Sequence, residues 1–179
     1  IIRSFELAKI DLKKNNFFLF YGENEGFKKQ VIEEKFKKFF KENTYLYDEN
    51  EIIQNEVDFF NKILSKSFFD NEKLIIITRV TDKIKNIIEE VLEKNIDDII
   101  LVLNAGALEK KSKLRALFEK DKSAICVPFY EDNNQTLSVI VNKFFRDSNI
   151  PISQQSINLI VQRCRGDRLN LKNELEKIQ

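Results

Sequence analysis

Short runs of consecutive apolar residues alternate along this chain with longer segments whose apolar residues recur every three or four positions. The apolar runs occupy 16–22, 44–48, 73–80, 98–104 and 123–129. Strands that are apolar at every position, instead of every second one, are typical of a sheet buried on both faces by crossover helices. The intervening segments have the apolar spacing of amphipathic helices. Together they predict a doubly wound α/β fold with about five parallel strands and helices on both faces.

The segment 51–67 illustrates the helical spacing. Ile53, Val57, Phe60 and Leu64 are separated by three or four residues. Residues at this spacing share one side of an α-helix. We therefore expect one helix over this segment, with these four side chains facing the core.

The strand signal stops after a polar stretch at 130–135, where three helical segments follow at 136–148, 153–164 and 166–179. A polar stretch between two different kinds of pattern is where domain boundaries usually fall. We expect an α/β domain over 1–132 and a small all-helical domain over 133–179.

The amino-acid composition limits the kinds of catalytic and metal-binding site that the chain can form. The 179 residues are 42% hydrophobic and 33% charged, with a formal net charge of +1, which is typical of a soluble globular chain and gives no strongly basic field. The absence of histidine excludes Ser-His and Cys-His catalysis and leaves few ligands for transition metals. Cys126 and Cys164 match no zinc spacing and are expected to be buried, reduced thiols. No apolar run approaches the ~18 residues of a membrane span.

The turn after the first strand has the setting of a phosphate-binding loop, G-x-x-x-x-G-K-[ST]. It begins at Gly22, and Lys28 stands at the position of the phosphate-binding lysine. Gly26 is one residue early, Phe27 fills the second glycine position, and Lys29 replaces the hydroxyl that binds magnesium. Neither later strand ends in the aspartate that magnesium also needs, since one ends at Thr78-Arg79 and another at Asn104-Ala105. The loop is therefore predicted to be degenerate and unable to support ATP hydrolysis.

Four stretches make a family resemblance specific: FLFYGENEGF, SFFDNEKLIII, LVLNAGALEKKSKLRALFEK and RCRGDRLNLKNELEKI. With them the chain resembles the delta subunits of the bacterial DNA polymerase III clamp loader, and the resemblance extends over essentially all of it. It implies an AAA+-like domain and its helical lid, without the carboxy-terminal collar domain. It also implies a cytoplasmic replication subunit with no catalytic residue, cofactor or metal of its own. The implied partners are the beta sliding clamp, the gamma/tau and delta-prime subunits, and primer–template DNA through the assembled complex.

Members of this family bind the clamp through a Leu-Phe pair just before the third strand. The corresponding residues here are Phe68 and Phe69, which follow Ser67, so the first position carries Phe in place of Leu. Residues 68 and 69 differ by about 100° around a helix and face opposite sides of a strand, so both do not easily enter one core. Asp70 and Asn71 indicate a surface turn. The resemblance thus implies that Ser67, Phe68 and Phe69 form a clamp-binding element; burial in the core is the other interpretation.

Two other functions are considered. An active AAA+ ATPase has the same architecture. A delta-prime-type loader subunit is structural, but it usually carries a zinc-type cysteine cluster and a Ser-Arg-Cys motif. In this chain Arg163-Cys164 follows Gln162 in the helical part, so neither feature is present. The resemblance favours the clamp-opening subunit.

Overall fold

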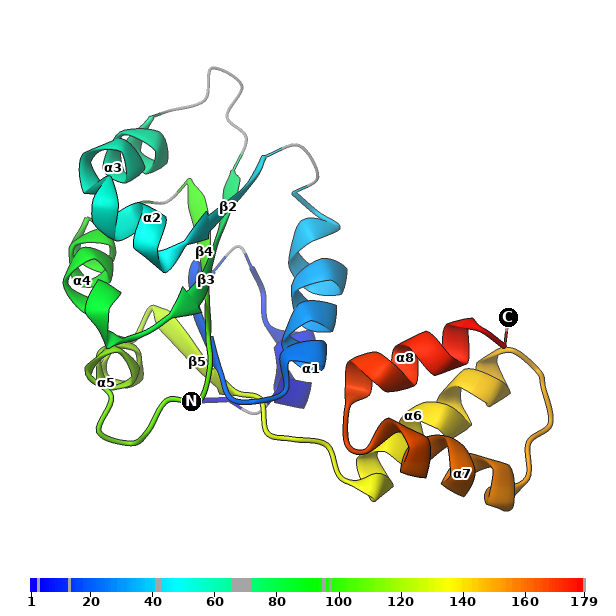
Figure 1. The fold of residues 1–179 in the computed structure, drawn as a ribbon. Coiled ribbons are helices and arrows are strands. Elements are labelled where there is room, and N and C mark those ends of the chain that lie inside the picture. Colours follow the sequence, from blue (N-terminus) through cyan, green and yellow to red (C-terminus); the bar gives the residue numbers. More distant parts are fainter. Residues whose placement is uncertain are drawn as a thin grey trace.

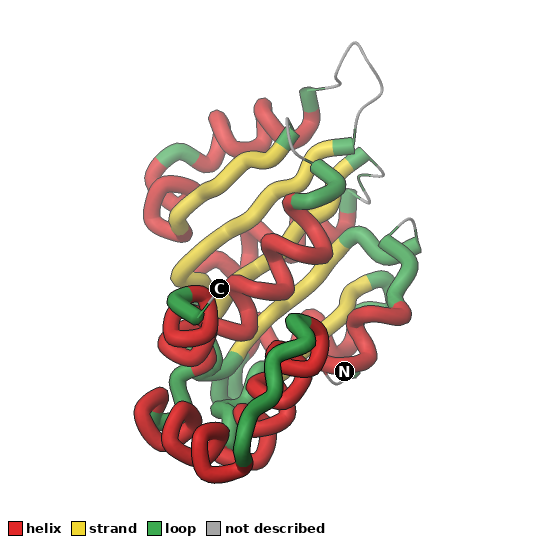
Figure 2. The backbone as a smooth tube through the Cα atoms, turned by 90° about the vertical axis from the view of Figure 1, so that its right-hand side faces the viewer, coloured by secondary structure: helices red, strands yellow, loops and turns green. Residues whose placement is uncertain are grey.

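The computed structural model describes residues 1–2, 4–12, 14–40, 43–65, 72–94, 96 and 98–178. Its centre is a parallel sheet in the order β2-β3-β4-β1-β5. The strands are β1 (Phe17–Tyr21), β2 (Thr44–Asp48), β3 (Lys73–Val80), β4 (Ile99–Ala105) and β5 (Ala124–Pro128). Figure 2 shows them running side by side. The α/β fold predicted from the apolar runs is confirmed.

Helices cover both faces of the sheet (Figure 1). One face carries α2 (Glu49–Gln54), α3 (Glu56–Leu64), α4 (Lys85–Glu93), which follows the short helix η3 (Asp82–Ile84), and α5 (Lys113–Lys120). The other carries η1 (Ser4–Lys9), α1 (Glu25–Val31) and the π-helical continuation η2 (Ile32–Lys37). Alternate residues of β1 enter the two cores: Phe17 and Leu19 pack on the first face, whereas Phe18 and Phe20 pack on the second. The strands are apolar at every position because both of their faces are buried.

Three helices follow β5: α6 (Asn134–Asp147), α7 (Gln154–Cys164) and α8 (Arg168–Glu176). We call them the three-helix unit. They share a core of their own, which includes Leu137, Val141, Val161 and Leu171, all at most 2% exposed. In Figure 1 this unit stands to one side of the sheet, with α8 nearest to α1.

The inward face predicted for 51–67 is wrong at three of its four positions; the fourth, Phe60, is half-buried and packs against the core. The helix is interrupted at Asn55, which ends α2 and begins α3 with a non-helical backbone. The structure buries Ile52, Phe59 and Ile63 instead. Val57 is 76% exposed, and Ile53 and Leu64 are also exposed. The buried residues themselves have helical spacing, but their series runs one position earlier along the chain than the predicted one.

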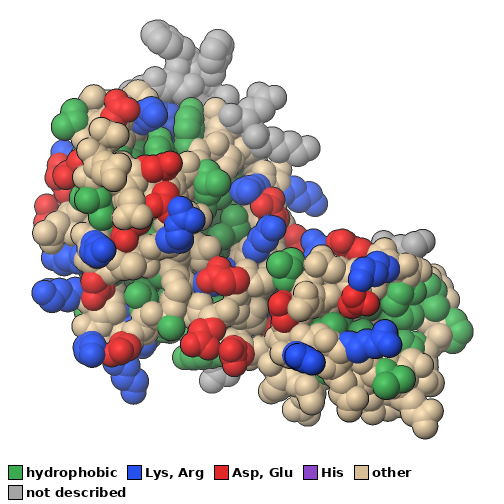
Figure 3. Space-filling view, viewed as in Figure 1, with side chains coloured by type: hydrophobic (Ala, Val, Ile, Leu, Met, Phe, Trp, Pro, Cys, Tyr) green, Lys and Arg blue, Asp and Glu red, His purple; other side chains and the backbone are tan. Residues whose placement is uncertain are grey.

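Charged residues of both signs are interspersed over the face seen in Figure 3. None of the helices in the described part of the chain has the length and apolar character needed to cross a membrane. Both cysteines, Cys126 and Cys164, are buried, and no disulfide joins them.

Candidate functional site: a glycine turn closed by the protein itself

The glycine turn, residues 22–26, leads from β1 into the first two residues of α1 and lies at the carboxyl ends of the strands. Gly22 has φ +121°, a conformation that favours glycine. A Cβ atom there would lie 2.2 Å from the carbonyl oxygen of Phe129. A Cβ atom at Gly26 would lie 2.8 Å from the backbone nitrogen of Leu169 in α8. Both glycines are therefore required by close backbone contacts within the protein.

Most backbone N–H groups of this turn already have acceptors. Gly22 donates to the carbonyl of Gly106 at 2.9 Å, and Asn24 donates to that of Phe129 at 3.3 Å. Phe27 donates to the side-chain oxygen of Asn24, at 3.0 Å. The N–H groups of Glu25 and Lys28 donate to the carbonyls of Glu23 and Asn24. A phosphate-binding loop works through backbone N–H groups directed at the anion, and here these donors are engaged elsewhere.

Lys28, the counterpart of the phosphate-binding lysine, is fully buried. Its ammonium donates to the carbonyl of Gly22 at 2.8 Å, to the carbonyl of Ala105 at 2.5 Å and to Oε1 of Glu25 at 2.6 Å. An ammonium has three donors, and all three are used. Lys28 therefore joins the ends of β1 and β4 to the first residue of α1, and its charge is neutralised by Glu25.

The two remaining loop positions also lack phosphate chemistry. Lys29, at the position of the magnesium-binding hydroxyl, is exposed. The ring of Phe27 packs edge-on against Phe129, with 5.2 Å between ring centres. The guanidinium of Arg168 lies 3.7 Å from the centre of the Phe27 ring, a distance typical of cation–π stacking. Phe27 thus serves as the surface on which the start of α8 rests.

Asp132 holds the glycine turn and the three-helix unit together. Its side chain is only 4% exposed and accepts hydrogen bonds from Nε and Nη2 of Arg168 at 2.7 and 2.6 Å. It also accepts from Nδ2 of Asn24 at 2.8 Å and from the hydroxyl of Thr136 at 2.9 Å. These partners belong to α8, to the N-cap of α1 and to α6. One carboxylate therefore fixes three elements that are distant in the sequence.

Burial by itself would raise the pKa of Asp132. The hydrogen bonds from Arg168 and Asn24 outweigh that effect and leave the pKa below its ordinary value of 3.8. A carboxyl group with a lowered pKa stabilises the fold above its unfolded-state pKa, and this stability is lost as pH falls through the folded-state value.

The space between the turn and α8 is small, and the charges around it are unfavourable for a triphosphate. The cavity there has a volume of about 280 Å³. Its lining carries five carboxylates (Glu23, Glu25, Glu131, Asp132 and Asp167) and two guanidinium groups (Arg165 and Arg168). Like charges at these distances repel, so the site disfavours a polyanion.

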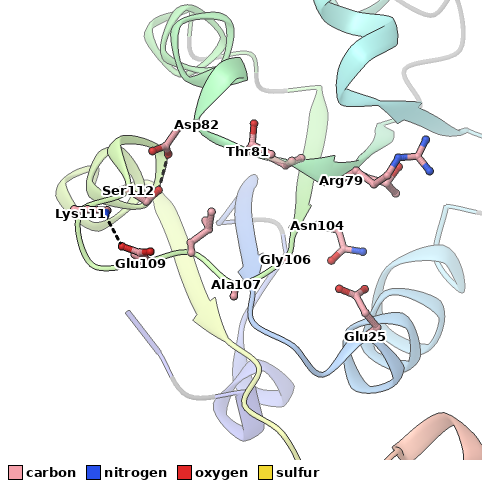
Figure 4. Close-up of a pocket in the computed structure, with 13 residues that line it drawn as sticks. Glu25, Arg79, Thr81, Asp82, Asn104, Gly106, Ala107, Glu109, Lys111 and Ser112 are labelled. Atoms are coloured by element: carbon pink, nitrogen blue, oxygen red, sulfur yellow. Dashed lines mark hydrogen bonds and ion pairs between the residues drawn. The ribbon is translucent and has the colours of Figure 1, made fainter.

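A larger cavity, about 640 Å³, opens at the carboxyl ends of β3 and β4 (Figure 4). The hydroxyl of Thr78 donates to the carbonyl of Tyr47 at 3.1 Å, and Arg79 pairs with Asp48. Asp82 accepts bonds from Ser112 and from the first backbone N–H groups of α5. Oδ1 of Asn104 is buried without a hydrogen-bond partner among the described residues, and Figure 4 shows this side chain facing Glu25.

Two carboxylates that line this cavity are already engaged within the protein. Glu25 is engaged with Lys28, and Asp82 caps α5. Across the described part of the chain, no group of three or more His, Cys, Asp or Glu residues is arranged to hold a metal ion.

The proposed clamp-binding residues Ser67, Phe68 and Phe69 lie outside the described residues, so the structure does not place them. It describes their flanks, Ser65 at the end of α3 and Glu72 before β3. The strands are parallel, so the amino end of β3 and the carboxyl end of β1 lie at opposite ends of the strands. The glycine turn therefore follows a strand at its carboxyl end, whereas the segment 66–71 precedes a strand at its amino end.

Sequence reasoning missed Asn24, Asp132 and Arg168 as site residues. Asn24 had only the signal of an N-cap residue. Asp132 lies in the polar stretch taken as a linker, and Arg168 lies in the recognised GDRLN stretch without any indication of its partner. Their contacts are between 36 and 108 residues apart in the sequence, beyond the reach of local patterns.

We predict that Asp132→Asn lowers the free energy of unfolding by about 3 kcal/mol at pH 7, because it leaves Arg168 without its buried partner. The difference from the parent protein should shrink as pH falls below the ordinary carboxyl pKa of 3.8. Urea unfolding at pH 7 and at pH 3 measures both effects.

Asp58→Asn is the matched control, since Asp58 is 72% exposed and its ion pair with Lys62 is long, at 3.9 Å. Its effect on the free energy of unfolding should stay below about 0.5 kcal/mol. Equal losses from the two substitutions, or a loss from Asp132→Asn that is the same at both pH values, would contradict the role given to Asp132.

No protein-family model matches the chain, and no curated protein matches it by sequence. Among solved structures, the DNA clamp loader delta protein of Bacillus subtilis is similar, with a TM-score of 0.63 and 16% identity over 97% of this chain. Two variants of RuvB from Thermotoga maritima have TM-scores of 0.56 and 0.55, at 12% and 13% identity over the same share of this chain.

The chain spans 56% of the length of the Bacillus protein and 58% of the length of each RuvB chain. Identities this low establish the fold and nothing finer. The sheet order and the helices that follow it are those of an AAA+-like fold, similar to the folds of a clamp-loader subunit and of RuvB.

Proposed function

We propose that this chain is the clamp-binding and clamp-opening part of a DNA polymerase III delta subunit, and that it has no ATPase activity of its own. The observation that carries the proposal is the closed glycine turn on an AAA+-like fold. Lys28 and most of the turn's N–H groups are saturated by protein acceptors, in a fold that is similar to a clamp-loader delta protein.

The proposal assigns the AAA+-like domain to residues 1–132 and the helical lid to 133–179. In this assignment the ion pair of Asp132 and Arg168 connects the two domains. In an active ATPase, a bound nucleotide would connect them. The lid would then keep one position relative to the sheet whether or not ATP is present. A subunit of this kind is a fixed support for a partner.

The partner in this proposal is the beta sliding clamp, which binds Phe68 and Phe69 next to Ser67. Other contacts are with the gamma/tau and delta-prime subunits, and with primer–template DNA through the assembled complex, in the cytoplasm. Two phenylalanine side chains entering an apolar pocket would contribute about 3–6 kcal/mol of transfer free energy. That is enough for the pair to dominate the binding energy.

We expect the purified chain to hydrolyse no ATP above the blank rate. Its melting temperature should also be unchanged by ATP and magnesium, because the ammonium of Lys28 and most N–H groups of the turn are already bonded within the protein. A ligand at 100 times its Kd adds about 2.7 kcal/mol of stability, so thermal denaturation detects real binding easily. A nucleotide-dependent rise in melting temperature would favour the alternative of an active AAA+ ATPase.

We expect Phe68→Ala with Phe69→Ala to weaken binding of the sliding clamp from the same source by about a hundredfold, equivalent to about 2.8 kcal/mol. The melting temperature should change little. Surface plasmon resonance with immobilised clamp measures the affinity, and differential scanning calorimetry measures stability.

Phe59→Ala is the matched control, because Phe59 is a buried aromatic residue of α3, 2% exposed. It should lower stability by about 3–5 kcal/mol. If the Phe68/Phe69 variant loses stability as Phe59→Ala does, the pair belongs to the core. A parent chain that does not bind the clamp would instead favour a structural subunit of the delta-prime type.

A further inference from the structure

Lys73, the first residue of β3, is buried in an unusual position for a lysine, with 7% of its surface exposed. Its ammonium donates to the carbonyl of Lys62 at 3.0 Å and to the hydroxyl oxygen of Ser65 at 3.0 Å. It also donates to the carbonyl of Ser65. All three donors of the ammonium are therefore used, and all the acceptors lie at the end of α3.

This contact has a clear physical basis. The last carbonyls of a helix have no partner within the helix and carry the negative end of its dipole. A buried ammonium needs such acceptors, because burying an unpaired charge is costly. Lys73 thus supplies the end of α3 with a cation that comes from the neighbouring strand.

Lys73 is itself held firmly. Its backbone N–H donates to the carbonyl of Asp98 at 2.9 Å, and the next residue, Leu74, donates to that of Asn43 at 2.9 Å. Leu74 is fully buried between β2 and β4. The ammonium therefore connects the end of α3 to a fixed point of the sheet.

Ser65 and Lys73 enclose the segment that contains Ser67, Phe68 and Phe69. We propose that Lys73 is a positioning residue for clamp binding: by bonding to Lys62 and Ser65 it fixes the distance between the two ends of this segment. The proposal rests on the proposed function and adds a residue that does not touch the clamp. Holding the ends of a binding segment in place lowers the entropy lost when it binds.

The test combines Lys73→Met with the Phe68→Ala/Phe69→Ala pair in a double-mutant cycle, with clamp affinity measured by surface plasmon resonance. Lys73→Met keeps much of the apolar stem and removes the three donors. We expect it to weaken clamp binding by about tenfold in the parent chain, an estimate based on the ordering of a few interface side chains. It should have no further effect when Phe68 and Phe69 are already alanine. Coupling of this kind separates positioning from a general loss of stability.

Lys62→Met is the matched control, since it removes a charge from the same turn of α3 but keeps the carbonyl that Lys73 uses; clamp affinity should not change. Ser65→Ala removes one acceptor and is a milder variant, expected to weaken binding in the same direction if Lys73→Met does not fold. This inference alone is overturned if Lys73→Met binds the clamp as the parent does while the Phe68/Phe69 variant loses binding. If Lys73→Met does not fold, parent-like affinity of Ser65→Ala has the same meaning. A parent chain without clamp affinity would overturn the proposed function as well.

Discussion

The buried ammonium of Lys28 is the interaction on which the carboxyl edge of this sheet depends. It is fully buried and bonded to Gly22, Ala105 and Glu25, so it closes the gap between the two central strands and the first helix. If it turned toward a nucleotide, it would remove this donor from the buried carbonyl of Ala105 and the partly buried carbonyl of Gly22. A buried polar group that loses its partner costs about 1–3 kcal/mol. In the position where a nucleotide-binding protein keeps a lysine for its ligand, this protein uses the lysine for its own structure.

The remaining contacts of the edge follow from this closure. With the turn filled, α8 can approach until the backbone of Leu169 meets Gly26 and Arg168 stacks on Phe27. Asp132 then neutralises Arg168 and also bonds to Asn24, which caps α1. The three-helix unit is therefore attached to the turn by charge-assisted hydrogen bonds among residues of the chain itself. Such bonds are among the stronger ones that proteins make.

The strands could be predicted from the sequence, and the turn's departures from a phosphate-binding pattern could be read there, because both depend on neighbouring residues. Consecutive apolar residues indicate strands buried on both faces, and Phe27 and Lys29 depart visibly from a phosphate-binding pattern. The inward face of α3 could not be predicted, since the segment contains two overlapping apolar series of helical spacing, one through Val57 and one through Phe59. Only packing against the sheet decides between them. The bonds of Asp132 and Lys28 also escaped prediction, because they join residues up to 108 and 77 positions apart.

The free energy of unfolding of Lys28→Met, measured in urea with and without ATP and magnesium, tests the structural role of Lys28 most directly. We expect a loss of about 3 kcal/mol relative to the parent, because the carbonyls of Gly22 and Ala105 lose a buried donor. ATP and magnesium should change the free energy of unfolding of neither protein. If Lys28→Met is as stable as the parent and ATP stabilises the parent alone, the lysine serves a nucleotide and has no structural role at this turn.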